Sequence, residues 1–336
     1  MTTAEPEPGA AIARETPPDR KARWEIPLAA WFPVVVLAAF FLVPVIGVPL
    51  AVLGWPFAPV PLVRLAHRRG LLSAGAAVLL SAGLLGLIFV PAAGLHAGVV
   101  TASVGAAIVG LPALFAAKIR RDGDPSGAFL WLCAAGVLLF NGLLLGLPLV
   151  GEPPVASSLK AALDANIPPA VESYRRANMD AVTLEQMQKT LFEARDLTVR
   201  YWPGLFGVFW VLGSAVASYV GAWTARPSPS AVSVRFEDLR IPAPVAGLFV
   251  AAGAGFALVH GVVRTISGDV LLTLAALYFV AGLSIICHFA RKWFRARILR
   301  FGLYTLAAYF PMSLGVALLG LFDWYLDFRH RGEKEK

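Results

Sequence analysis

Long apolar blocks, separated by short polar turns, are the feature that most limits the folds open to this chain. From Pro27 onward most of the blocks have the length of about 17–25 residues that an α-helix needs to cross a bilayer. Hydrophobic residues make up 58% of the chain and charged residues 15%, against about 45–50% and about 25% in soluble domains. The pattern predicts an all-α fold, a polytopic bundle of transmembrane helices. It excludes a soluble enzyme, a disordered protein and a disulfide scaffold.

The lengths of the blocks predict about nine spans, or eight if the second is re-entrant. Pro44, Gly47 and Pro49 break the first long block, and irregular backbone at membrane depth has to be covered by protein or line a cavity. We interpret the second span either as a pocket wall or as a proline-kinked hairpin without a function. The predicted spans are 28–45, 48–64, 71–93, 97–118, 127–149, 203–224, 243–262, 270–290 and 301–322.

Basic residues gather in four connectors that alternate with nearly uncharged turns. Together the connectors hold fourteen basic and four acidic residues, which accounts for the net charge of +8 without a nucleic-acid partner. With nine spans all four lie on the side of the amino terminus, which the positive-inside rule assigns to the cytoplasm. The same count places the basic carboxyl tail outside. The basic residues of the connectors are Arg64, Arg68, Arg69; Lys118, Arg120, Arg121; Arg226, Arg235, Arg240; and Arg291, Lys292, Arg295, Arg297, Arg300.

The chain divides into five parts by composition. Residues 151–202 are polar and, with nine spans, extracytoplasmic. Thr183 and Gln186 there resemble a capping box, followed by apolar residues at helical spacing. This part is interpreted either as a lid or docking surface, or as a solvated helical hairpin. The other parts are a disordered cytoplasmic tail at 1–26, membrane helices at 27–150 and 203–322, and a charged tail at 323–336.

Ionisable and amide side chains inside the spans are the candidate site residues, because each is costly there unless it is paired or hydrated. His260 and Arg264 are four residues apart near the end of the seventh span, and Asp269 opens the eighth. One helix face would present His260 and Arg264, and together with Asp269 they would bind an anionic or zwitterionic ligand at the outer mouth. Alternatively, Arg264 reaches the interface and pairs with Asp269, which caps the next helix. Asn141 lies within the fifth span and either links helices by hydrogen bonds or contacts a ligand.

Motifs for catalysis, nucleotide binding and metal binding are absent from the sequence. The two cysteines, Cys133 and Cys287, lie in apolar runs without redox or metal spacing. We therefore expect no enzyme activity, no cofactor and no metal. A transport role would require a separate ATPase chain as partner.

The last third of the chain carries the most distinctive segments, 235–242, 277–285 and 320–329, and residues 59–62 add a fourth. With these segments the sequence resembles the YybS-like family of predicted bacterial membrane proteins, a domain of unknown function. That family is remotely similar to the substrate-binding membrane subunits of energy-coupling-factor vitamin transporters. The resemblance implies a bacterial cytoplasmic membrane and an energising ATPase module, but no substrate contact can be matched here.

Two functions follow as hypotheses. The first is a small-molecule binding or transport subunit, suggested by the broken second span, the His260, Arg264 and Asp269 cluster and the family resemblance. The second is a structural or regulatory scaffold in the lipid bilayer, suggested by the scarcity of charge inside the spans. A lipid-modifying enzyme is less favoured, because the sequence shows no nucleophile–base pair.

Overall fold

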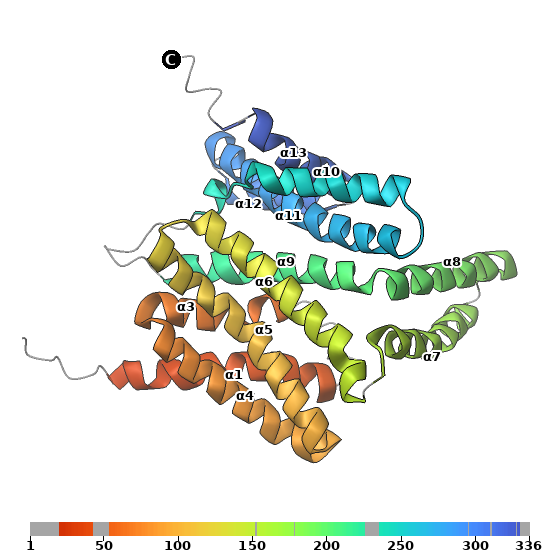
Figure 1. Ribbon diagram of the computed structural model, residues 1–336, viewed down its shortest axis with the longest axis horizontal. Helices are drawn as coiled ribbons and strands as arrows, with labels where there is room; N and C mark the ends of the chain where they lie inside the picture. Colours follow the sequence, from red (N-terminus) through yellow and green to blue (C-terminus); the bar gives the residue numbers. More distant parts are fainter. Residues whose placement is uncertain are drawn as a thin grey trace, which may run out of the picture.

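The computed structural model is helical throughout the part of the chain that it describes, with no strand there (Figure 1). It describes residues 20–42, 54–151, 153–177, 179–225, 235–294, 296–309, 311–326 and 328–329. The α-helices and three short 3₁₀ segments, marked η, are α1 (Arg20–Leu42), η1 (Trp55–Phe57), α3 (Val60–Arg69), α4 (Leu71–Ala93), α5 (Leu95–Asp122), α6 (Pro125–Gly146), η2 (Leu147–Val150), α7 (Val155–Arg176), α8 (Ala181–Arg200), α9 (Trp202–Ala225), η3 (Phe236–Asp238), α10 (Ala243–Leu258), α11 (Val262–Trp293), α12 (Arg297–Ala308) and α13 (Met312–Leu326).

Five stretches of helix are long and apolar enough to cross a membrane within these described ranges. They overlap five of the predicted spans, although the last stretch begins at Val262 and not at 270. The total of nine is not confirmed. Up to six spans result if the bent pair α12–α13 counts as one. The five stretches are Leu71–Pro91, Gly98–Ala116, Pro125–Leu149, Trp202–Ala225 and Val262–Trp293.

The first, second and seventh predicted spans differ from the structure in length. Residues 43–53 lie outside the described part, so the predicted break at Pro44–Pro49 does too. The rest of the second span is η1 and the ten-residue α3, which is too short to cross a bilayer. The apolar part of α1 is described over Glu25–Val36, and α10 has 16 residues.

The last predicted span, 301–322, is two helices that bend by 92°. Pro311 lies at the break, where its missing N–H and its ring oppose a continuous helix. After α13, Arg329 bonds to the backbone carbonyl of Glu237, whose carboxylate pairs with Arg291 near the end of α11. The α12–α13 pair therefore begins and ends at one end of the bundle. Arg329, at the start of the charged tail, lies beside the basic connectors, opposite to the side that nine crossings would give it.

The central helix is α9, which packs against α3, α5 and α6 on one side and α11 on the other (Figure 1). Trp210 of α9 is 1% exposed, and its ring lies 5.0 Å from that of Phe140 and 6.3 Å from that of Trp55. Its indole N–H donates to the carbonyl of Leu132 at 3.1 Å, so the buried polar atom is satisfied. A second core of small residues joins α1, α3, α4 and α5.

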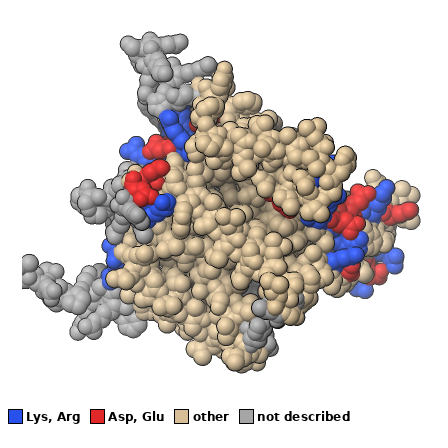
Figure 2. All heavy atoms as spheres, in the orientation of Figure 1, with Lys and Arg blue, Asp and Glu red and all other residues tan. Residues whose placement is uncertain are grey.

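Charged side chains gather at two opposite ends of the molecule, and an uncharged surface lies between them (Figure 2). Large apolar side chains are exposed on that surface, such as Leu72 at 92% and Leu87 at 74%. Such exposure is expected where lipid replaces water. We call the end with the four basic connectors, the start of α1 and the end of α13 the basic end, and the end with α7 and α8 the hairpin end (Figure 1).

The polar interval 151–202 forms the helical hairpin α7–α8. Arg195 of α8 pairs with Asp164 of α7 at 2.6 Å and with the neighbouring Asp196 at 2.7 Å. The N-cap of α8 is Asp180, which accepts hydrogen bonds from the backbone N–H and the hydroxyl of Thr183. Thr183 is thus the third residue of the helix and not the cap of the predicted box.

Candidate functional site

His260 and Arg264 do not share one helix face, contrary to the prediction. Helix α10 ends at Leu258, and Gly261 has a φ of 71° in the turn before α11, so His260 lies in the turn and Arg264 on the next helix. Both side chains are exposed, and the guanidinium of Arg264 lies 5.1 Å from the centroid of the Phe256 ring. The positive φ that glycine accepts thus separates residues that the spacing placed together.

Asp269 of α11 is directed at the start of α9. Its Oδ1 accepts a hydrogen bond from the backbone N–H of Gly204 at 2.9 Å. The first N–H groups of a helix have no partner within it, and the helix dipole favours a negative charge there. Gly204 is needed for this approach, because a Cβ would lie 2.6 Å from the Cα of Asp269. Asp269 therefore joins two helices, as a cap for α9.

Asn141 makes its hydrogen bond within its own helix. Its Nδ2 donates to the carbonyl of Val137 at 2.9 Å, and its buried Oδ1 accepts none from the described residues. The predicted link between helices is thus not formed by this side chain in the described part of the chain.

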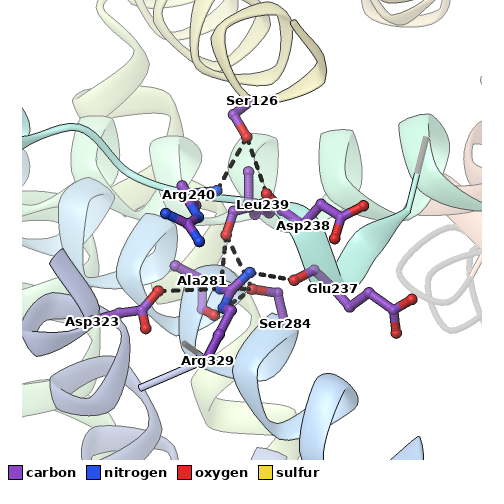
Figure 3. A network of polar contacts seen from close by, with 9 residues as sticks. All are labelled: Ser126, Glu237, Asp238, Leu239, Arg240, Ala281, Ser284, Asp323 and Arg329. Atoms are coloured by element: carbon purple, nitrogen blue, oxygen red, sulfur yellow. Dashed lines mark hydrogen bonds and ion pairs between the residues drawn. The ribbon is translucent and has the colours of Figure 1, made fainter. Parts of the chain in front are cut away.

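A polar cluster that the sequence did not single out surrounds Arg329 at the basic end (Figure 3). The guanidinium donates to the carbonyl oxygens of Glu237 and Leu239, the latter at 2.9 Å, and to the hydroxyl of Ser284 at 2.8 Å. It also pairs with Asp323 at 3.3 Å, while the side chain of Arg329 is 4% exposed. These contacts tie the end of α13 to α11 and to the linker between α9 and α10.

The linker around η3 is held in place from two directions. Leu239 and Ile241 are buried, at 1% and 7% exposure, so their side chains anchor the backbone on both sides of Arg240 to the core. Ser126, at the start of α6, accepts a hydrogen bond from the backbone N–H of Arg240 and donates to the carbonyl of Asp238 (Figure 3). The linker therefore presents its carbonyls in a fixed geometry to Arg329 on its other side.

A pocket of about 580 Å³ opens beside this linker. Its wall comes from the start of α6, from residues 238–242 and from Trp324 of α13. Asp124, Asp238 and Arg240 supply two negative groups and one positive group, and the indole of Trp324 supplies an aromatic surface. Among the residues that the structure describes, no three His, Cys, Asp or Glu side chains are grouped so that they could hold a metal ion.

The sequence identified the segments of this site but not their contact. Segments 235–242 and 320–329 are two of the distinctive segments, yet they lie about ninety residues apart in the chain. No local spacing connects them. The available signal was an arginine that directly follows an apolar helix and an aspartate six residues before it, Asp323.

Comparison with known proteins gives one match. A family model described as "Predicted membrane protein (DUF2232)" matches residues 32–324. Curated proteins and solved structures give no match. The matched range includes the pocket walls on α6, the linker and Trp324, but ends before Arg329.

Proposed function

The chain belongs to the DUF2232 family of predicted membrane proteins, and from this premise we propose that it binds a small charged molecule in the pocket at its basic end. The observation that carries the proposal is the pocket itself, in which acidic, basic and aromatic side chains meet next to a fixed polar linker. Its volume of about 580 Å³ lies in the range typical of small-molecule sites. The proposal assigns binding, not catalysis.

The side chains of the pocket favour a ligand with a positive group. The carboxylates of Asp124 and Asp238 attract a cation, and an indole face such as that of Trp324 binds ammonium groups. Arg240 offers a place for an anionic group at the same site. A small zwitterion or quaternary ammonium compound therefore fits the charges better than a dianion.

Binding is tested by thermal unfolding of the purified full chain with choline, carnitine and succinate as probes. A ligand that binds the folded state raises the unfolding midpoint in a concentration-dependent manner. We expect choline or carnitine to raise the midpoint, succinate to leave it unchanged, and Asp238→Asn or Trp324→Leu to abolish the shift. The matched control is Asp196→Asn on the hairpin, which should keep it. A shift that Asp238→Asn leaves intact contradicts the proposal.

We propose more specifically that the protein is the binding subunit of a transport system in a bacterial cytoplasmic membrane, with an energising ATPase chain as partner. The support is the resemblance to the YybS-like family and, through it, to energy-coupling-factor subunits. Affinity purification from native membranes should then recover an ATPase subunit, and deletion should lower uptake of the compound that binds. Binding without an ATPase partner and without altered uptake would reject transport but keep the binding function.

A scaffold is the second candidate, and the α7–α8 hairpin favours it. This hairpin lies at one end of the molecule, beyond the uncharged surface (Figure 2). It exposes apolar side chains such as Val182 at 75% and Leu197 at 59%. Exposed apolar groups outside the lipid region are typical of contact sites for other proteins. Photo-crosslinking from position 182 in intact cells should capture one reproducible partner. Capture of lipid alone would reject the scaffold.

A further inference from the structure

A second cavity at the basic end, the α1–α3 groove, is separate from the proposed ligand pocket. It has a volume of about 350 Å³ and lies between Glu25–Ala29 of α1 and Val60–Arg68 of α3, with Thr224 of α9 as a third wall. None of its lining residues belongs to the pocket beside Trp324.

The charge of the α1–α3 groove is positive and only partly neutralised. Glu25 accepts from Arg68 at 3.1 Å and from Arg69 at 2.8 Å, so one carboxylate serves two guanidinium groups. Arg64, one turn before Arg68 on the same side of α3, is exposed and forms no ion pair with any residue that the structure describes. An anion bound at Arg64 would thus contact one guanidinium that has no ion pair among the described residues. It would also compete with Glu25 for the guanidinium of Arg68.

The groove continues into an apolar strip along α1. Leu28 lines the groove, and Phe32 and Val35 follow it at helical spacing on the same face. Their exposed fractions are 67%, 44% and 58%, so the strip faces the region that lipid occupies. The positive groove therefore adjoins an exposed apolar strip. These two surfaces match the anionic head group and the apolar acyl chains of a phospholipid.

We infer that the α1–α3 groove holds the phosphodiester group of an anionic phospholipid, with Arg64 as its main charge partner and an acyl chain along Leu28, Phe32 and Val35. Basic pockets between membrane helices are known as lipid headgroup sites, and interfacial arginines attract anionic lipid. Glu25 limits the affinity, because it competes with the phosphate for Arg68.

The test uses the full chain in vesicles of phosphatidylcholine with and without phosphatidylglycerol, and native mass spectrometry to count retained lipids. Wild type should retain phosphatidylglycerol in preference to phosphatidylcholine. Arg64→Gln should weaken that retention about fivefold, the factor that corresponds to about 1 kcal/mol per interfacial arginine. Arg64→Lys should restore most of it, and Glu25→Gln should strengthen it.

The matched control is Arg235→Gln, which removes an exposed arginine at the same end but outside the groove. It should leave retention within about twofold of wild type, well short of the charge effect expected at Arg64. Equal losses in Arg64→Gln and Arg235→Gln would overturn the inference, because they would report general surface charge. Inorganic phosphate alone should not raise the unfolding midpoint of lipid-free, detergent-solubilised protein. A rise that Arg64→Gln abolishes would overturn the assignment to a lipid, because free phosphate would then suffice as the ligand.

Discussion

The guanidinium of Arg329 joins segments that lie far apart in the sequence, the linker at 237–239, Ser284 of α11 and Asp323 of α13. Two backbone carbonyls, a hydroxyl and a carboxylate need several donors spread over a plane, which arginine has and lysine lacks. Breaking a buried, hydrogen-bonded pair leaves polar groups without partners in a medium of low dielectric constant. The residue therefore holds one wall of the proposed ligand pocket.

Replacement of Arg329 by Gln is expected to lower the free energy of unfolding by about 3–5 kcal/mol, because it removes one partner of a buried pair. Arg329→Lys should recover only part of this loss. The control is Arg291→Gln, at a side chain that is 53% exposed, which leaves the Glu237 carboxylate at 13% exposure without this ion pair. Because water reaches one side of the pair, its loss should cost less than the loss of the buried Arg329 network. Unfolding of the three variants in one detergent provides the comparison. Similar losses for Arg329→Gln and Arg291→Gln would show that the network is not structural.

Asp180 makes the first turn of α8 sensitive to pH. The hydroxyl of Thr183, followed by its backbone N–H, holds the pKa of Asp180 below its ordinary value. A lowered pKa in the folded state contributes stability above the unfolded value, near pH 4, and the contribution is lost as the pH falls through the folded value. Hydrogen-exchange protection of the α8 amides, corrected for intrinsic rates, should therefore drop from about pH 6 to about pH 3.

The matched variant is Asp180→Asn, which keeps a capping side chain but removes the titrating group. Its protection at neutral pH should be close to that of wild type, and the drop in acid should be absent from the first turn. If the variant loses protection in acid to the same extent as wild type, another group controls the hairpin.

At the scale of the elements, two glycines allow α11 and α13 to pack in direct backbone contact. A Cβ on Gly282 would collide with the carbonyl oxygen of Val316, and a Cβ on Gly320 would collide with that of Tyr278. Small residues at such crossings are the usual basis of helix association in lipid. Gly142 and Gly146 form a GxxxG pair in α6, yet a Cβ added at either glycine would meet nothing within 4 Å.

Gly282→Ala is accordingly expected to destabilise the bundle by at least about 1–3 kcal/mol, because backbone atoms cannot yield as side-chain ends do. Gly142→Ala is the control, a glycine of the same chemistry in open space, and should be neutral or slightly stabilising. Thermal unfolding in detergent gives both values. Equal effects would place α13 away from α11 in the folded protein.

The sequence predicts long uninterrupted elements well and their ends less well. Hydropathy locates the five long apolar helices because lipid imposes a minimum length on them. It does not show that α10 ends at Leu258, four residues before the predicted boundary at 262, or that α12 and α13 are bent at Pro311. The contact of Arg329 with 237–239 depends on how distant elements pack, which neither periodicity nor composition records.

At the scale of the whole molecule, the charges define two ends, and the path of the helices decides which segments share an end (Figure 2). The amino-terminal part of α1 and the end of α13 both lie at the basic end (Figure 1). This arrangement removes the conflict that a nine-span count creates for the basic carboxyl tail, since Arg329 at the start of that tail lies at the basic end. We therefore propose that the basic end is cytoplasmic and the hairpin end extracytoplasmic.

Cysteine labelling with a membrane-impermeant maleimide in intact cells checks this orientation. The two buried native cysteines are first replaced by alanine, as Cys133→Ala and Cys287→Ala. Glu185→Cys on the exposed face of α8 should react from outside, whereas Lys292→Cys at the basic end should react only after the membrane is opened. Glu335→Cys then reports on the tail after Arg329. It should behave like Lys292→Cys, because the α12–α13 pair returns to the basic end. Labelling of Glu335→Cys from outside would mean that α12–α13 crosses the membrane, and it would refute this fold of the last third of the chain.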